Sequence, residues 1–261
     1  MSMMKCLLTM LSVAVLIGPA CSSAAAQIEA GKVLAAKAAA NQFVALAKGS
    51  DKSGAAPRES EPGVKRLLDA VFDARDVEAA KSIPFQALSP LGERMQAGTL
   101  VGLVYMLAGT GATNLGEVGT DPAAGEKINL NVIKFAPEMG RYLDFQIKIQ
   151  GAVVDAVLVR LSSAKPEERA RPNLQSGISN IQQGSARSVA GVIETLAVNG
   201  LTEEWRRERL PALTHIAPKL AKFLESAQKT ELQQLARACA DVMDDPQVKK
   251  SLQEFAAMMG N

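Results

Sequence analysis

Few side chains in this chain could carry out chemistry, and none has the partners that a catalytic motif requires. His215 is the only histidine, so neither a histidine-based zinc site nor a Ser-His-Asp triad has its usual partners. The spacing Ser-x-x-Lys occurs at Ser162 with Lys165 and at Ser226 with Lys229. The Lys-Thr-Gly motif that accompanies this spacing in the penicillin-recognising enzymes is absent. We therefore expect no catalytic residue and a protein that is not an enzyme.

Metal and cofactor motifs are missing as well. The Cys-x-x-Cys-His motif of c-type haem attachment does not occur. The glycines between Gly109 and Gly125 match neither phosphate-loop spacing, and the pair Asp244-Asp245 lacks the oxygen ladder of a calcium loop. The sequence thus predicts no metal and no cofactor.

The first 26 residues have the pattern of a secretory signal peptide. Lys5 precedes an apolar run, and small residues follow it up to Ala26. The apolar run is shorter than the ~20 residues that a membrane-spanning helix needs. Cleavage after Ala26 predicts a periplasmic or secreted protein. The alternative is a lipid anchor on Cys21, with Gly18 where bacterial lipoprotein signals carry a branched apolar residue.

Composition narrows the possible partners. Cleavage would remove Lys5 alone among the charged residues, leaving a net charge of about +1 and no electrostatic case for nucleic acid. Aromatic residues make up only 4% of the chain, which offers little for stacking on sugars or bases. Cys239 would be the one cysteine left, among alanines typical of a buried helix.

Hydrophobic spacing and capping residues predict an all-α fold, an irregular multi-helix bundle that could resemble a solenoid of helical pairs. After the signal peptide (1–26) we expect an N-terminal helix (27–48), a flexible linker (49–63) rich in Gly, Ser and Pro, and a helical domain (64–261). Within that domain the predicted elements are helices at 64–74, 77–82, 89–108, 172–198, 203–209 and 211–224, a loop at 109–126, a helix opened by the capping box at 230–233, and a last helix from 246 to 260.

Residues 128–161 allow two interpretations. Apolar residues alternate with polar ones in places, so an α+β fold with a hairpin in 127–150 is the alternative. Against it, one solvated stripe recurs at helical spacing; its members are Arg141, Asp144, Lys148 and Asp155. The helix accounts for more residues, with Pro137 starting or kinking it.

The first functional hypothesis is a carrier of an apolar ligand, such as a sterol-like or hopanoid-like lipid, in lipid transport within the cell envelope. The segment 100–107 is apolar on every side, and 142–161 is rich in alkyl side chains, so both could line a cavity between helices. The candidate lining residues are Leu103, Tyr105, Met106, Phe135, Tyr142 and Phe145.

The alternative hypothesis is a helical adaptor that binds another envelope protein. Trp205 stands beside Arg206 and close to Arg209, and an exposed Trp among arginines suits contact with a partner protein or a lipid headgroup. The same three residues also fit an ordinary solvated face with a buried indole ring.

Overall fold

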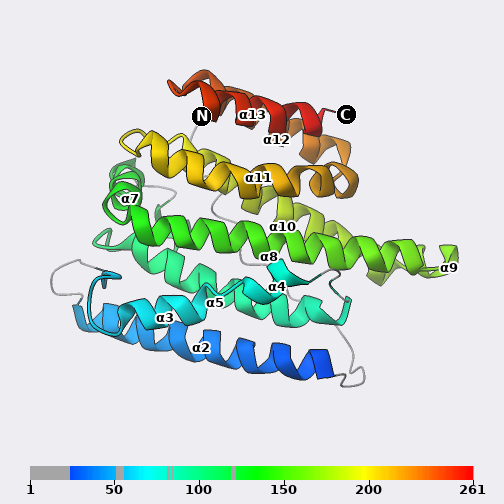
Figure 1. Ribbon diagram of the computed structural model, residues 1–261, viewed down its shortest axis with the longest axis horizontal. Coiled ribbons are helices and arrows are strands. Elements are labelled where there is room, and N and C mark those ends of the chain that lie inside the picture. The colour runs from blue at the N-terminus through cyan, green and yellow to red at the C-terminus, as the bar shows by residue number, and fades with distance from the viewer. Residues whose placement is uncertain (1–23, 51–55, 81–82, 84, 119–121, 261) are drawn as a thin grey trace.

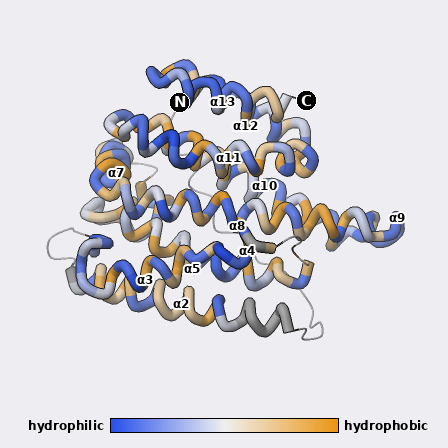
Figure 2. The backbone as a smooth tube through the Cα atoms, viewed as in Figure 1, coloured by the Kyte–Doolittle hydropathy of each residue, from blue (hydrophilic) through white to orange (hydrophobic). Residues whose placement is uncertain are grey.

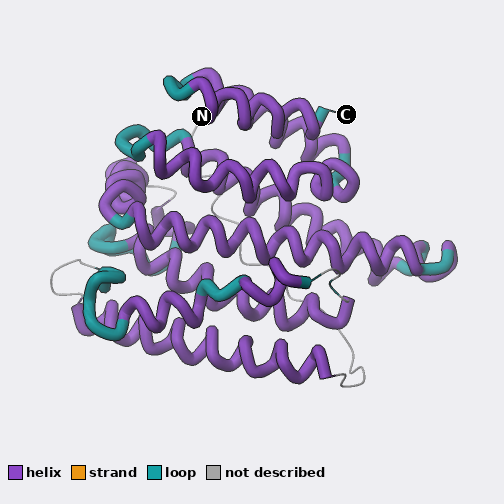
Figure 3. Tube along the Cα trace, in the orientation of Figure 1, coloured by secondary structure: helices purple, strands orange, loops and turns teal. Residues whose placement is uncertain are grey.

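The computed structural model describes residues 24–50, 56–80, 83, 85–118 and 122–260, and these contain helices but no strand (Figure 1, Figure 3). The predicted all-α, multi-helix fold is confirmed. The alternative of a hairpin in 127–150 is wrong, because helices α7 (Pro122–Lys134) and α8 (Ala136–Ser163) occupy this segment. Most of the expected signal peptide, including Cys21, lies outside the described residues.

Five long helices lie side by side across the molecule (Figure 1). In order they are α2 (Ala24–Ser50), α5 (Leu88–Leu107), α8, α11 (Glu203–Phe223) and α13 (Pro246–Met259). Each of them packs against the next one in this order. Two further helices complete the stack: α10 (Pro172–Leu196) packs against α8 and α12 (Ser226–Asp241), and α12 packs against α13.

The alanine-rich α2 packs against α5 and against α3 (Val64–Val71). Its buried residues Ala36, Ala40 and Phe43 recur at spacings of four and three, which places them on one side of a helix. The buried face of α3 includes Leu67 and Leu68.

Residues 56–63 are anchored, although their composition predicted a flexible linker over 49–63. The hydroxyl of Tyr105 donates a hydrogen bond to the Pro57 carbonyl at 2.9 Å. The Glu59 amide donates to Glu138 at 3.0 Å, and Arg141 donates to the Glu59 carboxylate at 2.6 Å. Since these anchors come from α5 and α8, local composition could not reveal them.

Helix α4 (Arg75–Ala79) and the 3₁₀ turn η2 (Phe85–Ala87) lead into α5. The turn runs directly into the helix at Leu88, so Ser89 lies inside α5 and does not cap it. Arg94 of α5 is 1% exposed and donates to the Asp76 carboxylate of α4 at 2.8 Å. This pair ties α4 to α5.

The loop expected over 109–126 is interrupted by helix α6 (Leu115–Val118), and α7 begins as early as Pro122. After Phe135, α8 begins with Pro137 in its first turn and continues without interruption to Ser163. The far end of α8 and the short α9 (Pro166–Arg169) project beyond the neighbouring helices (Figure 1).

Helix α11 is continuous, although the sequence predicted a break at Pro211. Pro211 and Pro218 both lie inside it and both are exposed. Because they are seven residues apart, they share the outer face, where water can hydrate the carbonyl groups that proline leaves without a donor. The Thr202 side chain caps α11 by accepting a hydrogen bond from the Trp205 amide.

The last two helices begin at defined caps. Helix α12 begins at Ser226, four residues before the predicted box, because Glu225 and Gln228 form the capping box instead. The Asp245 side chain caps α13 and accepts hydrogen bonds from two backbone amides. Apolar segments run along the central α5 and α8, whereas the projecting α9 is hydrophilic (Figure 2). The hydrophobic core therefore extends along the stacked helices.

Candidate functional site

A groove of about 520 Å³ is lined by residues of α4, α8 and α11 and by residues next to α4. We call it the α8–α11 groove. Its volume falls within the range of roughly 300–1,000 Å³ that is usual for binding pockets.

Apolar residues with little exposure form one part of the lining. Ile147, Ala152 and Ile216 are 3%, 5% and 1% exposed. A Cβ atom placed on Gly151 would meet only the Ile216 side chain, at 3.8 Å. The more exposed Ala212 faces the same groove from α11. Small side chains therefore keep space open between α8 and α11.

Charged residues form the rest of the lining, and carboxylates outnumber amines. The charged members are Glu78, Asp144, Asp155, Glu208, Lys148 and Lys219. The groove thus has more negative than positive groups, although the whole chain has a formal net charge of +2. Such a surface attracts positively charged partners.

Two ion pairs join the helices at the groove. Lys148 of α8 lies 2.7 Å from the Glu78 carboxylate of α4. Lys219 of α11 donates to the Asp155 carboxylate of α8 at 2.6 Å. Both amines are therefore already paired within the protein, which leaves Asp144 and Glu208 as the carboxylates nearest to Arg209.

Asp144 and Arg209 face each other without a hydrogen bond. Arg209 Nε lies 3.8 Å from Asp144 Oδ2, and neither Arg209 Nε nor the buried Asp144 Oδ1 has a hydrogen-bond partner among the described residues. Arg209 pairs instead with Glu208. Burial raises the pKa of Asp144 to about 6, against the lowering effect of Arg209 and Lys148.

Two further grooves adjoin this one. One of about 510 Å³ between α3, α4 and α8 shares Glu78, Asp144 and Lys148 with it. Another of about 340 Å³ between α11 and α13 shares Pro211 and His215. Asp144 therefore lies where two grooves meet.

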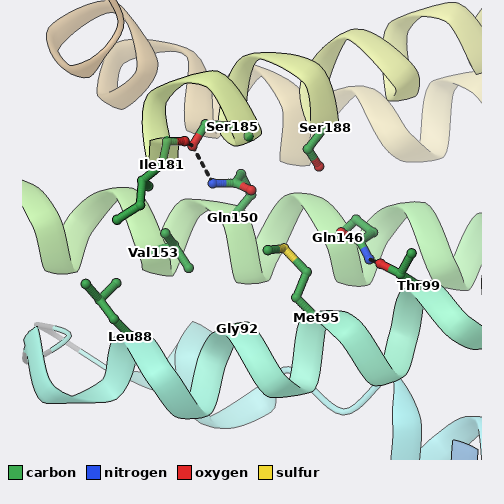
Figure 4. Close-up of a pocket in the computed structure, with 11 residues that line it drawn as sticks. Leu88, Gly92, Met95, Thr99, Gln146, Gln150, Val153, Ile181, Ser185 and Ser188 are labelled. Carbon is green, nitrogen blue, oxygen red and sulfur yellow. Dashed lines mark hydrogen bonds between the residues drawn. The ribbon is translucent and has the colours of Figure 1, made fainter. Parts of the chain in front are cut away.

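A smaller cavity of about 30 Å³ lies between α5, α8 and α10 (Figure 4). Gln150 donates to Ser185 at 2.6 Å across it, and Gln146 donates to Thr99 at 3.0 Å. A cavity of this volume and polarity suits one or two water molecules.

The residues expected to line a ligand cavity lie in the core or at its edge. The Tyr105 ring lies between those of Phe43 and Phe135 in tilted contacts, with centroid distances of 5.2 and 5.1 Å, and Met106 is 3% exposed. Leu103 is half-buried against the same core.

Tyr142 and Phe145 form a second aromatic group with Phe72, at ring-centroid distances of 6.2 and 5.6 Å. Phe145 and Phe72 also line the groove between α3, α4 and α8. None of the expected ligand residues lines the small cavity.

The residues expected to contact a partner are buried. Trp205 is 8% exposed and donates from its indole to the Ala136 carbonyl at 2.7 Å, and the Arg209 guanidinium lies 4.7 Å from the indole ring. Arg206 donates to the Leu196 and Val198 carbonyls at 2.8 and 2.9 Å. The indole is buried, as in the alternative interpretation, but Arg206 and Arg209 are each 7% exposed and do not form a solvated face. These three residues hold α11 against its neighbours.

The side chains with potential reactivity are dispersed. His215 is exposed in the α8–α11 groove. The Ser162 hydroxyl donates to the Val159 carbonyl at 2.8 Å. Cys239 is buried, donates to the Ile193 carbonyl at 3.5 Å, and has its pKa raised to about 12 by burial. Ser226 is the first residue of α12.

Asp144, Lys148 and Asp155 were not selected as site residues from the sequence. The available signal was their common stripe with Arg141, which indicates one exposed face of a helix. The sequence could not show that α4 and α11 flank this face, because the contacts that bring them together join residues far apart in the chain.

Within the part of the chain that the structure describes, no group of three or more His, Cys, Asp or Glu residues is placed to hold a metal ion. No helix formed by these residues combines the length and the apolar character needed to cross a membrane. Comparisons with protein-family models, curated proteins and solved structures find no match.

Proposed function

We propose that the protein is a non-enzymatic binding module that holds a segment of another polypeptide in the α8–α11 groove. The observation that carries the proposal is the groove itself, in which buried apolar residues lie beside charged ones from three helices. This arrangement matches protein interfaces, where an apolar centre is surrounded by a polar rim.

The occupant that fits best is an amphipathic segment with basic side chains. Its apolar side would cover Val77, Ala80 and Ala212, which line the groove and keep part of their surface exposed, as in complexes where a helix lies in a groove. Its basic side chains would meet the excess of carboxylates. The expected export of the chain places this partner in the cell envelope.

Site-specific crosslinking tests the proposal. A photoreactive residue at Ala212, in the groove, should crosslink a defined polypeptide from an envelope extract. The same residue at Ala238, exposed on α12, is the matched control and should not. An Ala212→Trp variant, which fills the groove, should fail to retain that polypeptide, whereas Ala238→Trp should retain it. Equal retention by both variants would exclude the groove as the binding site.

The hypothesis of a lipid carrier has less support. Most of its candidate residues are buried in the core, and the cavity between α5, α8 and α10 has only about 30 Å³, far below the volume of a lipid site. Carriage of a lipid would require these helices to separate. Organic extraction of the purified protein that yields a stoichiometric lipid would favour the carrier over the binding module.

A further inference from the structure

We infer that Asp144 is the specificity-determining residue of the α8–α11 groove: together with Glu208 it receives one lysine or arginine side chain of the bound segment, and its protonation controls the affinity. The inference rests on the proposed function of the groove.

The first argument is the position of Asp144. It lies on α8 where the α8–α11 groove meets the groove between α3, α4 and α8. A segment that follows either groove therefore passes this carboxylate. Its side chain is 31% exposed, and that of Glu208 is 58% exposed, so a ligand can reach both.

The second argument is the distribution of charge around Asp144. From α11, Arg209 and Glu208 face it; from α4, Glu78; and from α8 itself, Lys148. Lys148 already pairs with Glu78, so one arginine is left to neutralise both Asp144 and Glu208. A partner's cation would supply the missing positive charge.

The residues of the neighbouring groove do not change this balance. Asp73 pairs with Arg75 at 2.8 Å, and Arg141 donates to Asp69 at 2.6 Å. Their charges are therefore matched among themselves, and the unmatched negative charge is at Asp144 and Glu208.

The third argument is the hydrogen bonding of Asp144. Its Oδ1 has no donor among the described residues, and its Oδ2 is 3.8 Å from Arg209 Nε, which is too long for a hydrogen bond. A partly buried carboxylate without a donor is costly to keep. Oδ1 itself is buried, so an ammonium or guanidinium group in the groove would donate to Oδ2 of the same carboxylate.

Protonation then follows from burial. The pKa of Asp144 is about 6 in the free protein, so the carboxyl group loses its charge as the pH falls through this value. A bound cation favours the charged form. Affinity for a basic segment should therefore weaken as the pH falls below about 6.

The test uses fluorescence anisotropy with the purified protein and a synthetic amphipathic peptide of leucine and lysine at helical spacing. A matched peptide carries glutamine in place of lysine. We expect the lysine peptide to bind at least about tenfold more tightly than the glutamine peptide, and Asp144→Asn to remove about tenfold in affinity for the lysine peptide alone.

The pH profile separates recognition from a structural role. Affinity for the lysine peptide should fall on the acidic side of about pH 6 in the unmodified protein and should be flat in Asp144→Asn. His215 also lines the groove, and a His215→Gln variant should keep the pH dependence, which assigns that dependence to Asp144. Circular dichroism of each variant checks the fold.

The outcomes distinguish failure of the role assigned to Asp144 from failure of the function proposed for the groove. Equal binding of both peptides, or an unchanged profile in Asp144→Asn, overturns the role of Asp144 and leaves the groove as a binding site. Binding of the lysine peptide that survives Ala212→Trp shows that the groove is not its site and overturns the proposed function as well. Failure of the lysine peptide to bind also overturns the inference.

Discussion

Helix α8 meets its two long neighbours, α5 and α11, in opposite ways. Towards α5 the packing is closed: a Cβ atom on Gly98 would lie 2.5 Å from the Phe145 ring, and one on Gly102 would lie 2.8 Å from the Tyr142 ring. Towards α11, the only atoms near a Cβ on Gly151 are those of Ile216, at 3.8 Å. Glycine permits close packing on one side and leaves an open groove on the other.

The two sides also differ in what they bury. The α5 side contains aromatic rings, and burial raises the pKa of Tyr142 to about 12, so its hydroxyl remains neutral. The α11 side keeps Asp144 partly buried, with a pKa of about 6. Function can require groups that lower stability, so the α5 side fits a role in stability and the α11 side fits the binding role proposed above.

The largest effect is expected on the closed side. A Gly102→Ala substitution should lower the free energy of unfolding by about 2 kcal/mol, because the buried Tyr142 ring must move and overpacking exceeds the gain in helix propensity. Urea denaturation followed by circular dichroism measures this change.

Gly92 provides the matched control on the same helix. No atom lies within 4 Å of a Cβ at this position, which borders the small cavity. Gly92→Ala should therefore leave the protein as stable as before or more so. If both alanine variants had the same midpoint of denaturation, the close approach at Gly102 would not be limiting.

Local features of the fold could be read from the sequence, whereas features that depend on which face is exposed could not. Helical spacing predicted α3, α5, α10 and the interior of α8, and capping residues located the starts of α11 and α13. These features depend on residues within one or two turns of each other. The continuity of α11 through Pro211 was missed, because it depends on which face of the helix is exposed.

The candidate site was less accessible to prediction than the fold. The stripe with Asp144 and Lys148 indicated an exposed helix face, but its partners Glu78 and Lys219 lie on helices far away in the sequence. Trp205 is the opposite case, a residue that its sequence neighbours suggest to be exposed but that is buried. Its arginine neighbours are typical of a surface, yet the carbonyl of Ala136, 69 residues earlier, accepts its indole hydrogen.

A smaller effect is expected at the open side. Asp144→Asn should raise the free energy of unfolding by about 1 kcal/mol at pH 7, since folding holds the carboxyl pKa at about 6, above its ordinary value of 3.8. The folded state binds the proton more tightly, so the unmodified protein loses stability as the pH rises from about 4 to 6. Urea denaturation across this range should show that loss, and the asparagine variant should not.

Asp155→Asn is the comparison on the same helix. Its carboxylate has a direct partner, Lys219, at 2.6 Å, so removal of its charge should not stabilise the protein. Equal stabilisation by both asparagine variants would mean that general charge repulsion, and not the burial of Asp144, is responsible.

The smallest effect tests the open space itself. Gly151→Ala should raise the free energy of unfolding by less than about 1 kcal/mol, because alanine is the better helix former and its methyl group has ordinary contact with Ile216. The sign is opposite to that expected for Gly102→Ala, which makes the pair a direct measure of how differently α8 packs on its two sides. Chemical denaturation of the two variants under identical conditions gives that measure. A loss of stability in Gly151→Ala would mean that α8 and α11 pack as closely as α8 and α5, and the groove could then not admit a polypeptide segment without separation of the helices.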